Sequence, residues 1–364
     1  MTTDTARPEE LSRVADPDEG ISLDELRLAA RNHGMPLEAL RYDVTPPGLH
    51  YLLIHYDIPH VDPDTWRLAV DGLVARPMSL DLAALRSRPA TELTVTLECA
   101  GNGRARLHPR PVSQPWLDEA VGTARWTGVR LADLLAEAEP LDDAVDAVFT
   151  GLDHGTDRGV EQDYQRGLAL GDVGDALVAY AMNGQPLPPQ HGAPVRLVVP
   201  GWYGMASVKW LASITLIDEP FAGFQNATAY RVKHGDEPGE PVTRIQPRAL
   251  LAPPGFPDFM TRRRIVAAGP VVLTGRAWSG TGRVTRVEVS VDAGATWTDA
   301  ELGDRPGPYA WLPWTCRWTA EPGDTELLVR ATDDSGATQP VDQPWNTQGM
   351  ANNMAQRTAV TVRA

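Results

Sequence analysis

The segment LTVTLECAGNGR, residues 93–104, passes directly from an apolar strand pattern into a loop of small residues. Cys99 therefore emerges at the end of a strand, and Arg104 follows five positions later. A nearby arginine favours the thiolate, the form of cysteine that attacks electrophiles and binds soft metals. A free cysteine is more often a small buried hydrophobe, but packing alone does not require glycine on both sides of Asn102. The segment indicates a functional thiol.

A second segment carries most of the candidate anion-binding residues. HGAPVR at 191–196 is followed by LVVPGWYGMASVK at 197–209, which places a histidine, an arginine and a lysine around one strand and a glycine-bearing loop. Converging cations and loop N–H groups suit a phosphate or another anionic cofactor group. Taken singly, Arg196 and Lys209 also fit solvated or salt-bridged surface residues. Neither the nucleotide P-loop pattern nor the Rossmann fingerprint occurs.

Around these segments the chain alternates between short strand-like and helix-like runs. Strand-like runs occur at 51–55, 66–70 and 94–97, and helix-like runs at 80–85 and 129–137. Many Gly and Pro residues separate them, which predicts an α+β domain with long ordered loops. Before this domain, Ser22-Leu-Asp-Glu25 predicts a capped brace helix after a loose acidic tail over residues 1–20.

A different pattern follows a stretch rich in Pro and Gly between residues 237 and 255. Short runs with β-type alternation lie at 271–274, 284–291, 325–330 and 358–363. Turn residues separate them, as is typical of a β-sandwich of roughly one hundred residues. We therefore predict two domains with a boundary near residue 250.

Length and composition limit the function. A chain of 364 residues with 42% hydrophobic residues is long enough for two folded domains. The net charge of −15 disfavours nucleic acid and anionic membranes as partners. Two cysteines, Cys99 and Cys316, form no metal-binding spacing. No secretory leader or run of about 18 apolar residues is present, so we expect a cytoplasmic protein.

Together these motifs resemble the sulfite oxidase family of molybdopterin-dependent oxidoreductases, from about Tyr51 to the C-terminus. The motifs occur in the family's order: CAGNGR at 99–104, HGAPVR at 191–196, PG at 200–201 followed by SVKWL at 207–211, and SVDAGATW at 290–297. The resemblance implies an α+β fold in which a mixed molybdopterin-binding domain precedes an immunoglobulin-like β-sandwich that mediates dimerisation. On this reading residues 1–45 form a tail and brace helix, 46–250 the catalytic domain, and 251–364 the dimerisation domain.

The resemblance also assigns roles to residues. Cys99 is implied to ligate molybdenum alongside the dithiolene of molybdopterin. The implied cofactor-binding residues are His55, Asp153, His191, Arg196, Ser207 and Lys209. The implied substrate-anion pocket consists of Arg104, Trp116, Tyr230 and a late arginine matched to Arg357. Core packing of Trp116 and loop capping by Tyr230 remain open alternatives.

The implied activity is two-electron oxygen-atom transfer, with sulfite oxidised to sulfate. The chain departs from the family at Leu53, because the family usually carries an arginine there that helps to bind the sulfite anion. Loss of that contact keeps two alternatives open: reduction of a sulfoxide or N-oxide, and oxidation of a less charged sulfur compound. A non-catalytic cofactor-binding protein is a third. No haem motif is present, so we expect a separate redox partner, a homodimer, and a small oxyanion or sulfur-containing substrate.

Overall fold

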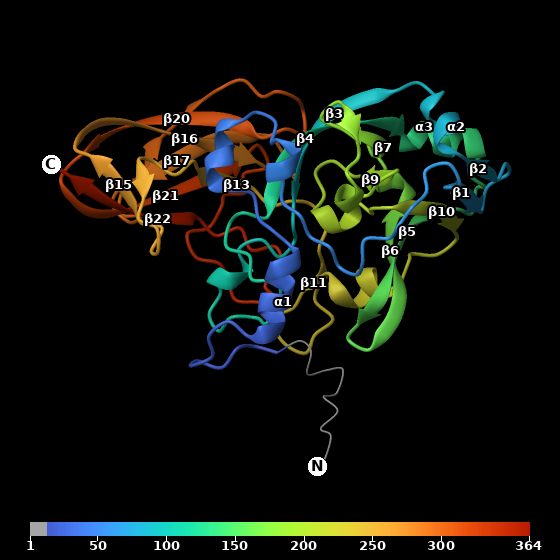
Figure 1. Ribbon diagram of the computed structural model, residues 1–364, viewed down its shortest axis with the longest axis horizontal. Helices are drawn as coiled ribbons and strands as arrows, with labels where there is room; N and C mark the ends of the chain where they lie inside the picture. The colour runs from blue at the N-terminus through green and yellow to red at the C-terminus, as the bar shows by residue number, and fades with distance from the viewer. Residues whose placement is uncertain (1–12) are drawn as a thin grey trace, which may run out of the picture.

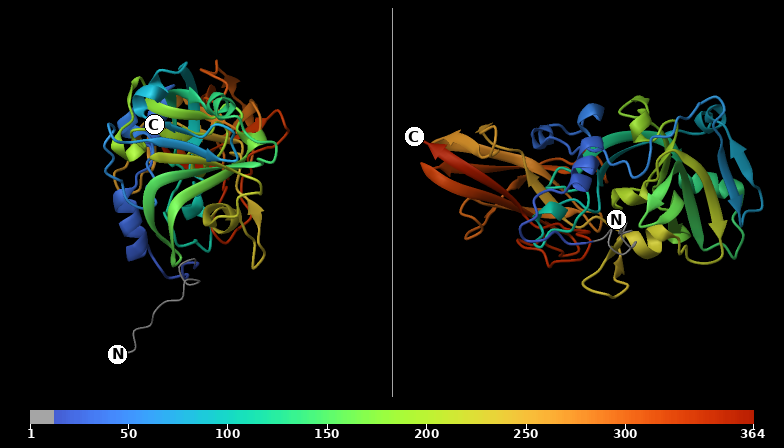
Figure 2. Two further views of the ribbon diagram at one scale, coloured as in Figure 1. Left: turned by 90° about the vertical axis from the view of Figure 1, so that its right-hand side faces the viewer. Right: turned by 60° about the horizontal axis from the view of Figure 1, so that its bottom comes forward.

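The computed structural model describes residues 13–364, which form two domains that lie end to end (Figure 1, Figure 2). The N-terminal segment packs along the junction between them. Helix α1 (Leu23–Arg31) begins at Ser22, whose hydroxyl accepts a hydrogen bond from the Glu25 N–H at 3.2 Å, and the predicted capping box is confirmed. Of the predicted acidic tail, residues 1–12 lie outside the described part of the chain. Val14 pairs with Pro111 in an isolated β-bridge.

Two sheets build the first domain. One has the order β2-β1-β10-β5-β6, and the other the order β3-β4-β7-β8, with β9 paired to β7. The strands are β1 (Leu68–Gly72), β2 (Met78–Leu80), β3 (Thr91–Glu98), β4 (Val121–Arg130), β5 (Asp146–Asp157), β6 (Val160–Ala169), β7 (Leu177–Met182), β8 (Gln185–Pro186), β9 (Arg196–Val198) and β10 (Leu211–Ile217). The helices are α2 (Leu82–Arg86) and α3 (Leu131–Ala138), with short turns η2 (Leu37–Arg41), η3 (Pro47–Leu49), η4 (Arg104–Arg106), η5 (Leu170–Asp172), η6 (Pro189–His191), η7 (Gly204–Ala206) and η8 (Gln225–Ala229).

Most of the elements predicted in this domain exist, with shifted boundaries. The run at 80–85 divides into the end of β2 and helix α2, because the Asp81 carboxylate accepts from the Ala84 N–H at 2.7 Å and caps a new helix there. The run at 129–137 begins as the end of β4 and becomes α3. The strand predicted at 51–55 is wrong, since only Leu52 makes a bridge, to His33. That segment instead lines the pocket described below.

The second domain is a sandwich of two sheets, as predicted. One sheet has the order β13-β16-β20-β19 and the other the order β14-β15-β22-β21-β17-β18. The strands are β13 (Arg248–Leu251), β14 (Phe256–Pro257), β15 (Arg264–Ala267), β16 (Gly269–Trp278), β17 (Val284–Ser290), β18 (Thr298–Asp299), β19 (Glu301–Leu302), β20 (Leu312–Ala320), β21 (Gly323–Asp333) and β22 (Gln356–Arg363), while β11 (Arg231–Val232) and β12 (Glu240–Pro241) form a hairpin before it.

Alternation along β20 shows why these residues form a sandwich strand. Leu312, Trp314, Cys316 and Trp318 are buried, while the residues between them face outward or are only partly covered. Cys316 therefore lies in the sandwich core. The mixed domain has its own larger core. Within residues 13–364, no helix is long and apolar enough to cross a membrane.

Candidate active site

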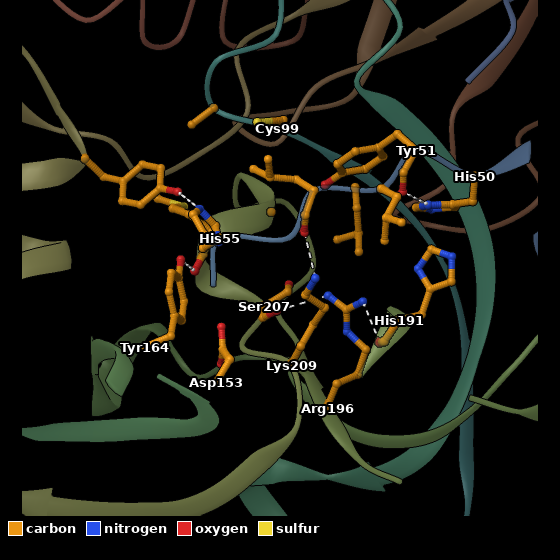
Figure 3. A pocket seen from close by; sticks show the side chains of 17 residues that line it. His50, Tyr51, His55, Cys99, Asp153, Tyr164, His191, Arg196, Ser207 and Lys209 are labelled. Atoms are coloured by element: carbon orange, nitrogen blue, oxygen red, sulfur yellow. Dashed lines mark hydrogen bonds between the residues drawn. The ribbon is translucent and has the colours of Figure 1, made fainter. Parts of the chain in front are cut away.

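A pocket in the first domain brings Cys99 of the first sequence segment together with His191, Arg196 and Lys209 of the second (Figure 3). It encloses about 620 Å³ of space outside the protein atoms, part of it open to solvent. Cys99 and Tyr230 line it, together with the six predicted cofactor residues: His55, Asp153, His191, Arg196, Ser207 and Lys209.

Most of these side chains come from loops at the ends of regular elements, whereas Asp153 and Arg196 lie in strands. Cys99 directly follows β3, and its N–H donates to the Ala120 carbonyl at 2.9 Å, which fixes the start of the loop. Asp153 lies in β5, where a bulge interrupts the pairing with β6. Ser207 and Lys209 follow the short turn η7. Tyr230 follows the π-helical turn η8.

Cys99 lies in a buried, cation-flanked position. Burial raises the pKa of the Cys99 thiol, and the nearby Arg104 guanidinium lowers it. Arg104 is itself buried, and its Nε donates to the Gln348 carbonyl at 2.7 Å. A metal cation at this thiol would favour the thiolate further. Cys99 is thus a suitable single-thiolate ligand.

Close packing around Arg104 explains why positions 101 and 349 are occupied by glycine. A Cβ at Gly101 would lie 2.6 Å from Arg104 Nη2, and a Cβ at Gly349 would lie 2.5 Å from Arg104 Cγ. Gly349 also has a φ of +60°, a region that favours glycine. The small residues of the Cys99 loop therefore make room for the arginine.

The other end of the pocket holds two cations, Arg196 and Lys209, that form no ion pair within residues 13–364. Arg196 is buried and donates to the carbonyls of His191 at 3.1 Å and Ser207 at 3.0 Å. Lys209 Nζ donates to the Leu53 carbonyl at 2.6 Å. Across residues 13–364, no carboxylate forms an ion pair with Arg104, Arg196 or Lys209. Buried cations left in this state are costly unless an anion joins them.

Asp153 is the acidic residue of the pocket. It is 4% exposed, and its Oδ1 has no hydrogen-bond partner among the described residues. Burial raises the pKa of Asp153, and burial lowers the pKa of Lys209. An unsatisfied, buried carboxyl oxygen is the kind of acceptor that a ring N–H of a ligand would satisfy.

The histidines of the pocket are neutral. Burial lowers the pKa of His55 to about 3 and the pKa of His191 to about 2. A neutral His55 that carries its proton on Nε2 donates to the Tyr230 hydroxyl oxygen, 2.6 Å away, which leaves the single proton of that hydroxyl for a ligand. Burial also holds the pKa of Tyr230 well above its usual range, so the phenol keeps its proton. Tyr230 is therefore a fixed hydrogen-bond donor facing the pocket.

Of the four predicted substrate residues, Tyr230 lines the pocket, whereas Arg104, Trp116 and Arg357 do not. Trp116 is buried in the cluster that contains Cys99, and its Nε1 has no partner among the described residues. The prediction for Arg357 is wrong: Arg357 lies on β22 and pairs with Glu326 at 3.0 Å, in the sandwich. The late segment that reaches the site is instead 346–353, where Gln348 contacts Arg104. The resemblance therefore matched the late arginine to a residue of strand β22, which belongs to the sandwich.

Sequence reasoning missed three aromatic or imidazole residues of the pocket: His50, Tyr51 and Tyr164. Tyr164 stacks on His55 with ring centroids 4.8 Å apart, and its hydroxyl donates to the Met205 carbonyl at 2.8 Å. Tyr164 is a single aromatic among polar residues in β6, a pattern that resembles an ordinary strand. The available signal for His50 and Tyr51 was the segment His50-Tyr-Leu-Leu-Ile-His55, in which a histidine stands at each end of a strand-like run.

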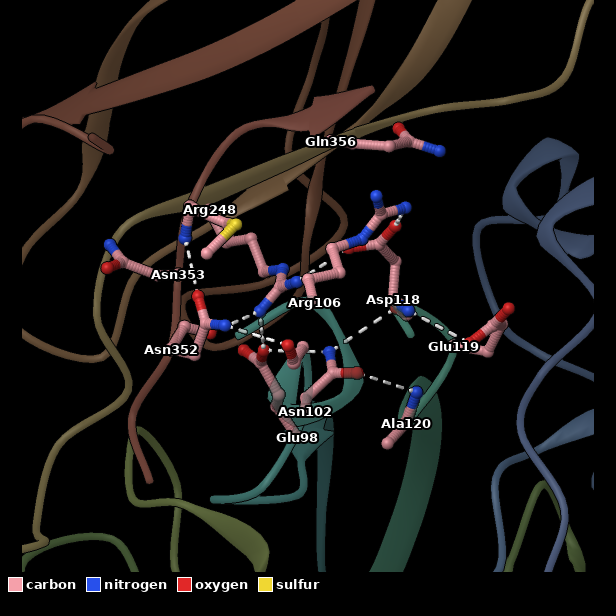
Figure 4. Close-up of polar contacts among 12 residues, drawn as sticks. Glu98, Asn102, Arg106, Asp118, Glu119, Ala120, Arg248, Asn352, Asn353 and Gln356 are labelled. Carbon is pink, nitrogen blue, oxygen red and sulfur yellow. Dashed lines mark hydrogen bonds and ion pairs between the residues drawn. The ribbon is translucent and has the colours of Figure 1, made fainter. Parts of the chain in front are cut away.

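A buried ion-pair network joins the Cys99 loop to the sandwich domain (Figure 4). Arg248, at the start of β13, contacts Glu98 Oε1 and Asp118 Oδ1, each at 3.0 Å. Trp278 Nε1 donates to the other Glu98 oxygen at 2.7 Å. Asn352 Nδ2 donates to the Gly103 carbonyl at 2.7 Å. Both sides of the Cys99 loop are therefore held by residues of the second domain.

The residues of the pocket fit the predicted molybdenum cofactor. Cys99 offers one soft ligand, and the described residues contain no group of three His, Cys, Asp or Glu side chains that could hold a metal by themselves. A metal at Cys99 would thus take its other ligands from the cofactor. Arg196 and Lys209 suit its phosphate, and the unpaired Asp153 oxygen suits its ring N–H groups.

Comparisons with known proteins agree with this geometry. Residues 55–225 match the family "Oxidoreductase molybdopterin binding domain", and residues 258–363 match "Mo-co oxidoreductase dimerisation domain". These matches confirm the predicted fold class of a molybdopterin-binding domain followed by a dimerisation sandwich.

Three relatives illustrate the range of similar proteins. Sulfite oxidase of Gallus gallus is 39% identical over 329 residues, covering 84% of this chain and 71% of that protein. Mitochondrial sulfite oxidase of Mus musculus is 36% identical, covering 88% of this chain, which spans 62% of the mouse protein's length. A nitrate reductase of Hordeum vulgare is 33% identical, covering 88% of this chain and 39% of that protein.

One solved structure has the same architecture over nearly the whole chain. The sulfane dehydrogenase SoxCD from Paracoccus pantotrophus superimposes with a TM-score of 0.80 and 25% identity, covering 97% of this chain and 90% of that chain.

Proposed function

Because the chain belongs to the sulfite oxidase family of molybdopterin-dependent oxidoreductases, we propose that it oxidises sulfite to sulfate and passes the electrons to an external acceptor. The net reaction converts sulfite and water into sulfate, two protons and two electrons. The bound molybdenum cofactor supplies the oxygen-atom transfer and the two-electron redox chemistry.

One observation carries the proposal. A buried thiol, Cys99, and Tyr230 line the pocket, and Arg104, a buried cation with no acidic partner in residues 13–364, lies outside the lining but near enough to lower the pKa of the thiol. A thiolate that can hold a metal and a cation that can hold an oxyanion are thus adjacent. The other end of the pocket supplies Arg196 and Lys209 for the cofactor.

The chain's own residues bind and orient the reactants. Arg104 attracts the anionic oxygens of sulfite, and Tyr230 donates a hydrogen bond to one of them. His55 stays neutral and holds the Tyr230 hydroxyl in place at 2.6 Å. Burial of these groups keeps bulk water away, which strengthens each electrostatic contact. The protein thereby positions sulfite against the bound cofactor.

Leu53 favours a second candidate. It lines the pocket and presents an apolar side chain where a further cation would strengthen sulfite binding. The candidate is oxidation of a less charged sulfur compound, or reduction of a sulfoxide or N-oxide. The likeness to a sulfane dehydrogenase is consistent with the first of these reactions.

A substrate comparison separates the candidates. Protein shown to contain about one molybdenum per chain is assayed for sulfite-dependent reduction of ferricyanide, and in parallel for reduction of methionine sulfoxide and trimethylamine N-oxide by a viologen. The proposal predicts saturable turnover with sulfite. Turnover with the neutral oxides and none with sulfite would favour the second candidate and overturn the first.

The setting of the enzyme is part of the proposal. We propose a cytoplasmic homodimer with a separate redox partner. The match to a dimerisation domain over residues 258–363 supports the homodimer. Phe259 and Met260, which are 82% and 81% exposed on a turn of the sandwich, give this domain exposed apolar surface of the kind that assembly covers.

A further inference from the structure

A hairpin of the first domain brings a second arginine, Arg158, close to Arg104. Strands β5 and β6 are joined by Arg158 and Gly159 alone, with φ values of +50° and +74°. Two consecutive residues with positive φ make the tight turn that matches the twist of a hairpin. Asn or Gly usually occupies the first of these positions, so an arginine there is unusual. In Figure 1 this hairpin extends past the sheet toward the segment that contains η8.

The Arg158 side chain turns back from the tip toward the site. Its two terminal nitrogens each lie 3.0 Å from the side-chain oxygen of Gln348, in the amide orientation that satisfies both neighbours. In that orientation the Gln348 amide nitrogen donates to the Ala229 carbonyl at 2.7 Å, directly before Tyr230. Arg158 Nε also forms a long ion pair with Asp157 Oδ1 at 3.9 Å, which is beyond hydrogen-bonding distance. The guanidinium is thus held by an amide.

Gln348 joins this arginine to Arg104. The Gln348 carbonyl accepts from Arg104 Nε at 2.7 Å, while its side chain accepts from Arg158. Two guanidinium groups therefore converge on one residue that is 8% exposed. Like charges held this close repel each other, and a bound anion would relieve the repulsion. Arg158 remains partly exposed, with 23% of its side chain accessible, so it stands at the outer side of the pair.

We propose that Arg158, oriented by Gln348, is a specificity-determining residue that forms the outer half of the substrate-anion site beside Arg104. This inference rests on the proposed function, since it assumes an anionic substrate at Cys99. It also accounts for two features of the chain. Leu53 offers no cation to the pocket, and Arg357 lies in the sandwich. The β5–β6 hairpin supplies the missing positive charge from a different direction.

The test uses substitutions that spare the turn. Arg158→Asn removes the charge and keeps a residue that tolerates positive φ. Arg158→Lys keeps the charge and loses the two-nitrogen contact with Gln348. Arg262→Asn is the matched control, because Arg262 also has a positive φ, +57°, in a turn of the sandwich domain. Each variant is prepared with its molybdenum content confirmed.

Arg158→Asn is expected to raise KM for sulfite about 10- to 100-fold, the effect of one lost charge-assisted contact, with kcat changed less than about threefold. The inhibition constant of sulfate should rise in parallel, and Arg158→Lys should fall between the two. Arg262→Asn should match the wild type. An unchanged KM and sulfate inhibition constant in Arg158→Asn would overturn the proposal.

A direct binding measurement separates this inference from the proposed function. Calorimetric titration of sulfite and sulfate into the molybdenum-loaded proteins needs no turnover. If the wild type binds these anions without oxidising sulfite, and Arg158→Asn binds them at least tenfold more weakly, the proposed function fails and the anion site stands. If Arg158→Asn binds them as tightly as the wild type, the anion site fails whatever the activity.

Discussion

At the scale of single residues, the site depends on charges placed where the protein alone does not neutralise them. Arg104 and Arg196 are buried against carbonyl oxygens, and Asp153 keeps an unpartnered oxygen, all within the described chain. Such an arrangement destabilises the cofactor-free protein and favours binding of an anionic ligand. Two predictions test this view of the residues.

Replacing Lys209 separates the effect of this buried cation on stability from its role in binding the cofactor. Burial lowers the pKa of Lys209 in the folded protein. Between that pKa and the usual value for lysine, the unfolded chain therefore binds one more proton than the folded protein, and the free energy of unfolding rises with pH. Lys209→Met removes this penalty. In cofactor-free protein, it should raise the free energy of unfolding by about 1–2 kcal/mol at pH 7. The gain should shrink toward pH 10.

Urea unfolding at pH 7 and pH 10 measures the gain, and elemental analysis of protein from a molybdenum-replete host measures cofactor retention. Lys209→Met should retain little molybdenum despite its higher stability. Lys233→Met, at the other lysine of the chain, should change neither quantity. A Lys209→Met protein that is less stable and fully loaded would contradict the account.

Gly101 should act through Arg104. An added Cβ would lie 2.6–2.8 Å from the Arg104 guanidinium atoms, so Gly101→Ala forces the guanidinium to move. We expect KM for sulfite to rise about tenfold, the effect of one weakened charged contact, with molybdenum content unchanged. Steady-state kinetics measure this, and Gly171→Ala, where an added Cβ meets nothing within 4 Å, is the control. Equal KM values in both variants would argue against a role for Arg104 in binding.

At the scale of elements, local patterns predicted what local forces determine. Strand β3 ends at Glu98, so Cys99 emerges where the apolar pattern indicated, and the capping box of α1 forms as expected. The strands of the sandwich follow their alternation. These features depend on residues close together in sequence, which is why the sequence was sufficient to predict them.

Features that depend on distant segments were not predictable in this way. Residues 51–55 have strand-like composition, but the Leu53 carbonyl accepts from Lys209 and no neighbouring strand pairs with the segment in the described structure. Gln348 and Arg158 lie 190 residues apart in the numbering and meet only in the fold. Tyr164 joins the pocket because β6 pairs with β5. Tertiary pairing decides each of these contacts.

At the scale of the whole molecule, the sandwich domain supports the active site directly. Arg248 is fully buried and bridges Glu98, which precedes Cys99, to Asp118 (Figure 4). Asn352 holds the Gly103 carbonyl on the other side of the loop. The second domain is therefore required for the geometry of the Cys99 loop as well as for the proposed assembly.

Removal of Arg248 tests this coupling. Arg248→Met leaves the Glu98 carboxylate buried without its cation, while Asp118 keeps its ion pair with Arg106, and it should lower the free energy of unfolding by about 3–5 kcal/mol. Urea unfolding measures the loss. The double variant Arg248→Met/Glu98→Gln should recover part of it, because the amide that replaces the Glu98 carboxylate carries no charge. A loss below about 1 kcal/mol in the single variant would mean that the network contributes little to the junction.

The central claim is that Cys99 holds the molybdenum at which sulfite is oxidised. The most direct measurement compares the Cys99→Ser and Cys316→Ser variants; Cys316 lies in the sandwich core and serves as the control. The readouts are the sulfate formed per molybdenum and the ratio of ferricyanide reduced to sulfate formed, which is two for sulfite oxidation. Cys316→Ser should keep wild-type turnover per molybdenum, whereas Cys99→Ser should lose it by at least about a thousandfold, because a hydroxyl is a poor substitute for a soft thiolate ligand. Cys99→Ser protein that oxidises sulfite at the rate of the wild type would contradict the account.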